Sequence, residues 1–122
     1  MTTALVIEDN EDNMVLITKL LNKSGYETLE ATTGLSGYQM AQDERPDFII
    51  LDIQLPDIMG TEVLDRVRAN EQTQGIPVIA MTSYAMSGDK ERLLAAGCNG
   101  YIEKPINPML VISQIEKTLE TI

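Results

Sequence analysis

Short hydrophobic runs alternate with longer amphipathic segments along the whole chain. The run at residues 48–51 has no polar face, which is typical of a strand that is covered on both sides. A weaker run from Tyr26 to Ala31 alternates between apolar and polar residues, as a half-buried strand does. The pattern therefore predicts five short strands. The four clearest runs are Ala4-Leu5-Val6-Ile7, Phe48-Ile49-Ile50-Leu51, Val78-Ile79-Ala80-Met81 and Gly100-Tyr101-Ile102.

Between these runs, apolar residues recur at helical spacing. Those from Met14 to Leu21 predict a first helix, and Gly25 is a typical residue to end it. A weaker helical stretch runs from Gly34 to Asp43, and a third helix is predicted to begin near Gly60. Leu93-Leu94 indicate a short fourth helix. Each predicted strand is thus followed by a predicted helix.

The last helix has the clearest signal. Asn107 can cap a helix, and Pro108 suits the first helical position. The spacing therefore predicts a helix that begins at Asn107-Pro108 and runs to the end of the sequence. Its apolar residues follow at intervals of 3, 4 and 3 positions: Ile112, Ile115, Leu119 and Ile122.

Strands that alternate with helices indicate an α/β fold. Such a chain forms a parallel sheet with helices on both faces, joined by right-handed crossovers. The 122 residues correspond to one domain, residues 1–122, because domains average ~150 residues. There is no linker, internal repeat or low-complexity tract in the sequence.

Polar residues of different kinds stand where the four clearest runs end. If these runs are neighbouring parallel strands, their carboxyl ends line one crevice, which is where ligands bind in open α/β sheets. That crevice would hold three carboxylates, a hydroxyl and an ammonium. The residues are, in chain order, Glu8 and Asp9, Asp52, Thr82 and, after Glu103, Lys104.

Each of these residues also has an ordinary structural interpretation. Residues 8–12 could be a solvated acidic loop that caps the first helix, because anionic side chains are favoured there. Thr82 could be an ordinary strand residue, and Lys104 a surface lysine. Asp52 differs, because it ends a fully apolar strand, where an unpaired carboxylate is costly. The prediction of a site therefore depends on the agreement of all four strand ends.

The charge and composition narrow the classes of function. Nine basic and nineteen acidic residues give a net charge of −10, which disfavours nucleic acid and anionic membranes as partners and favours cationic protein surfaces. No apolar run approaches the ~20 residues of a membrane span, so we expect a cytoplasmic protein. The absence of histidine excludes His-based triads. The one cysteine, Cys98, is expected to be a small buried hydrophobe.

Three carboxylates within a few ångströms repel one another, and the Lys104 ammonium neutralises only one of them. A hard divalent cation would relieve the excess charge, and oxygen ligands that leave room for several waters suit Mg²⁺. Asp52 could then attack phosphorus as a nucleophile. The expected product is an aspartyl phosphate stabilised by Mg²⁺, the Lys104 ammonium and the Thr82 hydroxyl.

The motifs that carry these residues resemble the receiver domains of two-component response regulators. The resemblance covers essentially the whole chain, and the motifs are specific in their combined order and spacing. It implies the flavodoxin-like (βα)5 receiver fold, with a five-stranded parallel sheet in the order 2-1-3-4-5. The motifs are Glu8-Asp9, Ile50-Leu51-Asp52-Ile53-Gln54-Leu55-Pro56 with Gly60, Met81-Thr82-Ser83, and Lys104-Pro105.

The resemblance implies a role for each acidic residue of the site. Asp52 would be the phosphoacceptor. Asp9, Asp52 and the main-chain carbonyl of Gln54 would bind Mg²⁺ directly, and Glu8 would act through water. Glu8 stands where many members of the family have aspartate.

The resemblance also assigns the phosphoryl-binding and switch residues. Thr82 and Lys104 would hold the phosphoryl group, and Tyr101 would be the aromatic switch residue, with a cis bond between Lys104 and Pro105. Tyr101 could instead be a half-buried strand tyrosine with a fixed rotamer. Gln54 and Tyr84, two residues beyond Asp52 and Thr82 respectively, are expected to flank the path of an attacking water, and the bulk of Tyr84 to shield the phosphoryl group from it. The surface expected to change spans residues 87–122.

A signalling switch is the implied function, not an enzyme. A sensor histidine kinase or a histidine phosphotransferase would donate the phosphoryl group, and a downstream protein target would receive the output. Because the sequence ends with the last helix, we expect no effector domain on this chain. We also expect a monomer or a weak dimer that binds neither nucleic acid nor membrane.

Two other classes share parts of this pattern. A haloacid-dehalogenase-type phosphatase also uses an aspartate at a strand end with Mg²⁺, but needs a second aspartate two residues later, where this chain has Gln54. A flavodoxin-type FMN carrier would share the fold. Its first loop would have to cradle a phosphate, whereas the acidic residues 8–12 would repel one.

Overall fold

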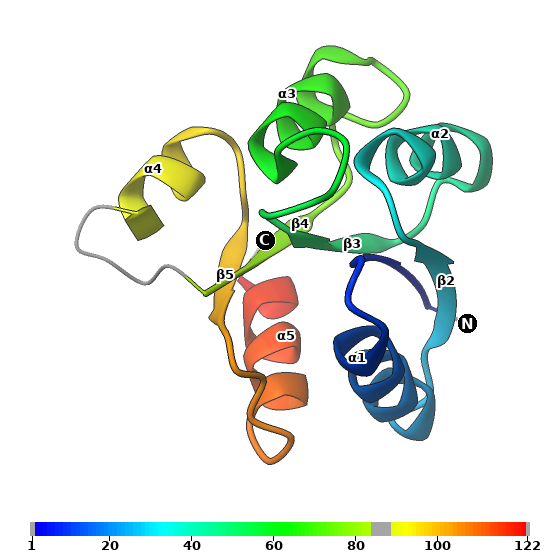
Figure 1. The fold of residues 1–122 in the computed structure, drawn as a ribbon, viewed down its shortest axis with the longest axis vertical. Helices are drawn as coiled ribbons and strands as arrows, with labels where there is room; N and C mark the ends of the chain where they lie inside the picture. The colour runs from blue at the N-terminus through cyan, green and yellow to red at the C-terminus, as the bar shows by residue number, and fades with distance from the viewer. Residues whose placement is uncertain (1, 84–88, 122) are drawn as a thin grey trace.

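The computed structural model of the protein describes residues 2–83 and 89–121. Within these ranges, five strands alternate with five helices (Figure 1). The strands are β1 (Thr3–Ile7), β2 (Glu27–Ala31), β3 (Phe48–Asp52), β4 (Val78–Thr82) and β5 (Gly100–Glu103). The helices are α1 (Glu11–Lys23), α2 (Gly34–Glu44), α3 (Gly60–Ala69), α4 (Asp89–Ala95) and α5 (Val111–Glu120).

The strands form one parallel sheet in the order β2-β1-β3-β4-β5. This confirms both the α/β fold class and the order that the resemblance implies. The register places Ile7 opposite Leu51, and Asp52 opposite Met81. As a result, β1, β3 and β4 end at one edge of the sheet, and the residues that follow β1 lie beside the end of β3.

Helices cover both faces of the sheet, as predicted (Figure 1). Helices α1 and α5 pack on one face, and α2, α3 and α4 on the other. The apolar strands explain this arrangement, because successive side chains point to opposite faces. In β3, Ile49 and Leu51 pack under α2 and α3, whereas Phe48 and Ile50 pack toward α1 and α5.

Helix α1 begins with a well-formed cap. The Asn10 side-chain oxygen accepts a hydrogen bond from Asn13 N at 3.0 Å, and Glu11 and Asp12 lie in the first turn. Negative charge there is favoured by the helix dipole. The helix ends before Gly25, which has a positive φ of 96° that glycine adopts without strain. Residues 10–12 therefore behave as the acidic cap that the sequence allowed.

The predicted start of the last helix was wrong. Helix α5 begins at Val111, not at Asn107-Pro108. The Asn107 side-chain oxygen accepts a hydrogen bond from Met109 N at 3.0 Å, so Asn107 caps the turn at residues 108–110 that leads directly into the helix. Val111 and Ile115 are fully buried and form the centre of the helix's contact with the sheet. The chemistry that suits a helix start also suits such a turn.

Two further expectations can be compared with the structure. Cys98 is buried, with 6% of its surface exposed, as expected for a small hydrophobe. Burial raises the pKa of its thiol to about 11, although the nearby Arg68 guanidinium opposes this shift. Among the described helices, none has the length and apolar character that crossing a bilayer requires.

Candidate functional site

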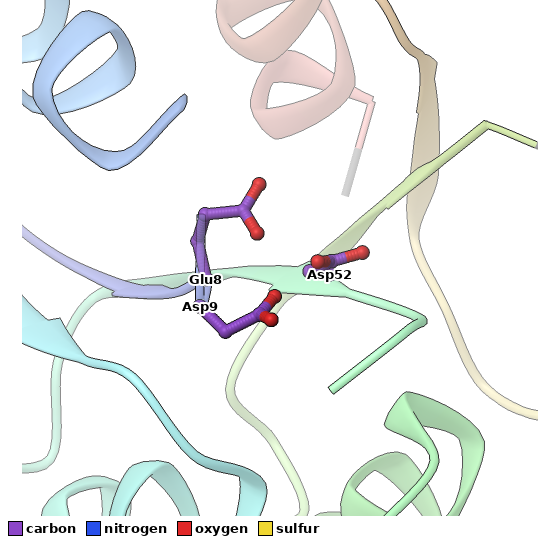
Figure 2. A group of neighbouring side chains, drawn as sticks. All are labelled: Glu8, Asp9 and Asp52. Carbon is purple, nitrogen blue, oxygen red and sulfur yellow. The ribbon is translucent and has the colours of Figure 1, made fainter. Parts of the chain in front are cut away.

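Three carboxylates gather beyond the ends of β1 and β3 (Figure 2). Glu8 and Asp9 follow the last residue of β1, and Asp52 is the last residue of β3. One carboxylate oxygen from each residue lies within 4.8 Å of the others. Glu8 and Asp52 are buried, with 0% and 3% of their surfaces exposed, whereas Asp9 faces solvent. The pairing of β1 with β3 explains this cluster.

The ammonium of Lys104, which follows β5, lies between the two buried carboxylates. Its Nζ atom is 2.7 Å from Glu8 Oε1 and 3.2 Å from Asp52 Oδ2. The single ammonium of Lys104 is therefore at ion-pair distance from two carboxylates, not from one as the sequence alone suggested. The Lys104-Pro105 bond that brings β5 into the turn beyond it is cis, as the resemblance implies.

Glu8 is buried, and its main partner is the Lys104 ammonium. Its Oε1 atom is held by this ion pair, and its Oε2 atom accepts a hydrogen bond from Asn10 N at 3.3 Å. Burial, and then the neighbouring Asp52, raise the pKa of Glu8 to about 7, against the influence of Lys104. The site therefore has too little positive charge for its carboxylates.

The two buried carboxylates also change the pKa of Lys104. Burial, the largest single influence, lowers the pKa of its ammonium, but Glu8 and Asp52 together outweigh burial and raise it. The lysine therefore stays charged, and it holds the two buried carboxylates in place.

Asp52 is further positioned by the loop that follows it. Its Oδ1 atom accepts a hydrogen bond from the Gln54 backbone N–H at 3.1 Å. The Gln54 side chain is exposed to solvent. Gly60 closes the loop by donating its N–H to the Ile53 carbonyl at 2.8 Å. A Cβ atom on Gly60 would lie 2.5 Å from the Asp52 carbonyl oxygen, so only glycine fits there.

The two residues expected to act as the switch lie on β4 and β5. Thr82 is the last residue of β4 and is 3% exposed. Tyr101 is half-buried, and its hydroxyl donates to Glu103 Oε1 at 3.2 Å on the exposed side of the strand. Burial, and then the charge of Glu103, raise the pKa of Tyr101. Tyr84 lies outside the described residues.

The donor atoms of this site fit a hard divalent cation. All three clustered side chains offer carboxylate oxygens, which Mg²⁺ prefers, and the exposed position of Asp9 leaves one side open for water ligands. The pKa of Glu8, raised by burial and then by the neighbouring Asp52, indicates that added positive charge would stabilise the ionised cluster. The arrangement thus offers oxygen ligands that suit Mg²⁺ beside the buried carboxylate of Asp52.

Sequence reasoning missed one residue beside the site. Both carboxylate oxygens of Asp57 accept hydrogen bonds from the first turn of α2, from Gly34 N at 2.8 Å and Leu35 N at 2.9 Å. These hydrogen bonds, with that from Leu35 first, hold the pKa of Asp57 below its usual range. The contact joins segments more than 20 residues apart, so no local pattern in the sequence indicates it.

Comparison with known protein families and sequences shows the family to which the chain belongs. Residues 4–116 match the response regulator receiver domain family. The chain is 43% identical over 117 residues to the polar-differentiation response regulator DivK of Brucella anthropi, which covers 96% of this chain and 95% of that protein. The opening Ile7-Glu8-Asp9-Asn10 and residues 85–89 indicate a likeness to this regulator from the sequence alone, and the identity confirms it.

Solved structures of receiver domains have the same fold. A CheY-like receiver domain protein from Methanospirillum hungatei superposes with a TM-score of 0.89 at 29% identity, covering 99% of this chain and 95% of that one. The receiver domain of a sensor histidine kinase from Pseudomonas aeruginosa, with a magnesium ion coordinated in its active-site cleft, superposes with a TM-score of 0.87 at 30% identity, covering 98% of each chain.

Proposed function

The chain belongs to the response regulator receiver domains of two-component signalling, and on this premise we propose that it is a phospho-accepting switch whose phosphoacceptor is Asp52. One observation carries the proposal: a lysine ammonium lies between two buried carboxylates of a three-carboxylate cluster at the end of the central strand. One ammonium does not balance three carboxylates, and a divalent metal ion would supply the missing positive charge for them and for an incoming phosphoryl group.

Mg²⁺ is the metal that we propose for this cluster. Asp9, Asp52 and the Gln54 main-chain carbonyl would hold it, and Glu8 would act through a water molecule. When bound, it would neutralise the carboxylates and attract the oxygens of an anionic phosphoryl donor. The magnesium ion in the related Pseudomonas aeruginosa receiver domain supports this choice.

Phosphoryl transfer would then use the residues around Asp52. A carboxylate oxygen of Asp52 would form a bond to phosphorus while the bond from phosphorus to the donor breaks, and the leaving group would keep the electron pair. The donor atom is an imidazole nitrogen in a phosphohistidine or an acyl oxygen in acetyl phosphate. Lys104 and Thr82 would stabilise the transferred phosphoryl group through an ion pair and a hydrogen bond.

The donor and target of this switch would be proteins. A sensor histidine kinase or a histidine phosphotransferase would supply the phosphoryl group, and a downstream protein would read the phosphorylated surface. Gln54 at the second position after Asp52 argues against a dehalogenase-type phosphatase, which needs an acid there. The acidic residues 8–12 argue against a flavodoxin-type cofactor site.

Incubation with Mg²⁺ and acetyl phosphate tests the proposal. We expect one phosphoryl group per chain, stable in acid and labile in base, as an acyl phosphate is. A chelator such as EDTA should abolish the labelling. Labelling at an unchanged rate in EDTA would contradict the metal-dependent mechanism, and no labelling under any condition would contradict the function.

Replacing Asp9 should raise the stability of the metal-free fold and weaken its Mg²⁺ binding. Asp9→Asn removes one of three mutually repelling carboxylates, so we expect the metal-free melting temperature to rise by about 3 °C. The same variant should bind Mg²⁺ at least about tenfold more weakly, because a ligand is lost. Thermal melts with and without Mg²⁺ measure both effects. The Mg²⁺ concentration is about 10 mM, which is roughly saturating for such sites. Melting that ignores Mg²⁺ in the wild type would contradict the proposed metal site.

Mg²⁺ affinity should depend on pH through Glu8. The pKa of Glu8 in the fold, about 7, lies above the ordinary value of 4.5. Protonation therefore stabilises the metal-free fold, fully below about pH 4.5, and this contribution is lost as the pH rises through about 7. Because Mg²⁺ requires the carboxylate, its affinity should rise roughly tenfold from pH 6 to pH 8.

Isothermal titration at the two pH values measures this dependence, and Glu8→Gln is the control. The variant cannot titrate at this position, so its Mg²⁺ affinity should be nearly the same at pH 6 and pH 8. Equal affinities in the wild type would show that Glu8 does not control the metal site.

Thr82 and Tyr101 should convert phosphorylation into partner binding. We propose that Thr82 moves toward the phosphoryl group and vacates space that the Tyr101 ring fills, which alters the surface formed by α4, β5 and α5. Phosphorylation would favour a state that is already populated, and a change from 1:99 to 99:1 requires ~5.5 kcal/mol. Thr82→Ala and Tyr101→Ala should still accept phosphate but lose the gain in partner affinity.

The partner for this experiment would be captured from cell lysate on the protein treated with beryllofluoride, a phosphoryl mimic. Affinity is then measured with and without the mimic. If Tyr101→Ala keeps the full effect of the mimic, the ring is the fixed half-buried strand tyrosine that the sequence also allowed.

A further inference from the structure

The loop that joins β3 to α3, residues 53–59, is held at its base and at its far side. At the base, Ile53 N donates to the Met81 carbonyl of β4 at 3.1 Å, and Gly60 N donates to the Ile53 carbonyl at 2.8 Å. At the far side, the Asp57 carboxylate bonds to the first turn of α2. Between these two points lies Gln54.

The contact between Asp57 and α2 uses both oxygens and a full charge. The first N–H groups of a helix have no partner within the helix, and its N-terminus favours negative charge. Helix α2 has no acidic residue of its own in the first turn. Thr33 satisfies Ser36 N at 3.2 Å, and Asp57 satisfies the N–H groups of Gly34 and Leu35. The loop thus supplies a carboxylate that α2 lacks.

Apolar contacts hold the same part of the loop against α2. A Cβ atom on Gly34 would lie 2.6 Å from Ile58 Cγ1, so the helix backbone and the Ile58 side chain are in direct contact. Leu55 and Ile58 are partly buried against the core under α2 and α3. Asp57 itself is solvent-exposed, so its two hydrogen bonds and the neighbouring apolar contacts of Ile58 together hold the loop against α2.

We propose that Asp57 is a positioning residue for the metal site, which fixes the loop so that the main-chain carbonyl of Gln54 stays in place to bind Mg²⁺. This inference rests on the proposed function. A main-chain carbonyl has no rotamer with which to adjust, so its position follows the loop. Only Leu55 and Pro56 separate Gln54 from Asp57, and proline restricts the backbone between them. A displacement at Asp57 should therefore reach Gln54.

Mg²⁺ titration calorimetry on three variants tests this inference. Asp57→Ala removes both hydrogen bonds, and Asp57→Asn keeps one acceptor oxygen without the charge. Thr33→Ala is the matched control, because it removes another cap of the same helix turn, whose hydrogen bonds go to Ser36 within that turn. All titrations are made well below the lowest melting temperature, so that only folded protein is compared.

We expect Asp57→Ala to weaken Mg²⁺ binding roughly fivefold to tenfold, and Asp57→Asn to fall between it and the wild type. Thr33→Ala should lower the melting temperature but keep the Mg²⁺ affinity within about twofold of the wild type. In the metal-free protein, hydrogen exchange of the Gln54 amide should be faster in Asp57→Ala, because its bond to Asp52 is less constrained.

Other results would overturn the inference. If both Asp57 variants bind Mg²⁺ as the wild type does, the residue is only a helix cap. If Thr33→Ala weakens binding as much as Asp57→Ala, the stability of α2 controls the site and the loop contact does not. If Asp57→Ala fails to fold, the Asn variant decides by the same criteria. A wild type that binds no Mg²⁺ would overturn the proposed metal site together with this inference.

Discussion

Asp52→Asn should abolish phosphorylation by acetyl phosphate. The amide has no free carboxylate oxygen to attack phosphorus, and the other two acidic residues of the cluster are placed differently. Asp52 is the last residue of a fully buried strand, and its Oδ2 atom lies 3.2 Å from the Lys104 ammonium. Asp9 is solvent-exposed, and Glu8 is fully buried. We expect incorporation to fall at least about 100-fold, as for other essential nucleophiles.

Intact-protein mass spectrometry after a fixed incubation measures this loss. Asp12→Asn is the control. Asp12 is an exposed aspartate in the first turn of α1, so this substitution removes the same charge outside the cluster. It should be labelled at the wild-type level. Circular dichroism should show that both variants are folded. Undiminished labelling of Asp52→Asn would remove the central residue from the proposed function.

Lys104→Met should destabilise the metal-free protein, and Mg²⁺ should restore much of the loss. Methionine keeps the length of the side chain but leaves Glu8 and Asp52 without their shared cation. Removing one partner of a buried ion pair typically costs about 3 kcal/mol, which corresponds to a fall in melting temperature of roughly 10 °C for a domain of this size. Saturating Mg²⁺ supplies positive charge to the same carboxylates. The gain in melting temperature on adding Mg²⁺ should therefore be larger in the variant than in the wild type.

Thermal melts at pH 8, with EDTA or with Mg²⁺, measure both parts of this prediction. Lys104→Arg is the matched control, since it keeps a cation near the two carboxylates and should lose less stability. If Lys104→Met melts as the wild type does without metal, the ion pairs contribute nothing to the fold. If Mg²⁺ stabilises both proteins equally, the ammonium and the metal do not act on the same charges.

Much of the fold could be predicted from local patterns. The apolar run of β3 was unambiguous because Phe48 and Ile50 face one layer of helices while Ile49 and Leu51 face the other. Periodicity alone does not say which strands are neighbours, so the strand order came from the family resemblance. The start of α5 was misplaced because Asn107 suits a capped turn as well as a capped helix.

The candidate site was only partly visible in the sequence. Strand ends in a parallel sheet lie at one edge, which was enough to bring Glu8, Asp9 and Asp52 together. Two features of the site depend on how β5 and the turn after it pack, and no local sequence pattern indicates this packing. These features are the complete burial of Glu8 and the position of Lys104 between two carboxylates. Asp57 was missed for a similar reason, because its partners on α2 lie 22 and 23 residues away in the chain.

The location of the phosphoryl group is the most direct test of this account. Loss of labelling in a variant could also follow from a disturbed charge, because one carboxylate oxygen each from Glu8, Asp9 and Asp52 lies within 4.8 Å of the others. Borohydride reduces an aspartyl phosphate to homoserine, which marks the modified residue in the wild-type protein. After labelling with Mg²⁺ and acetyl phosphate, tandem mass spectrometry should find homoserine at position 52 and at no other aspartate. Reduction at position 9, or at Glu8, with Asp52 unmodified would contradict the account.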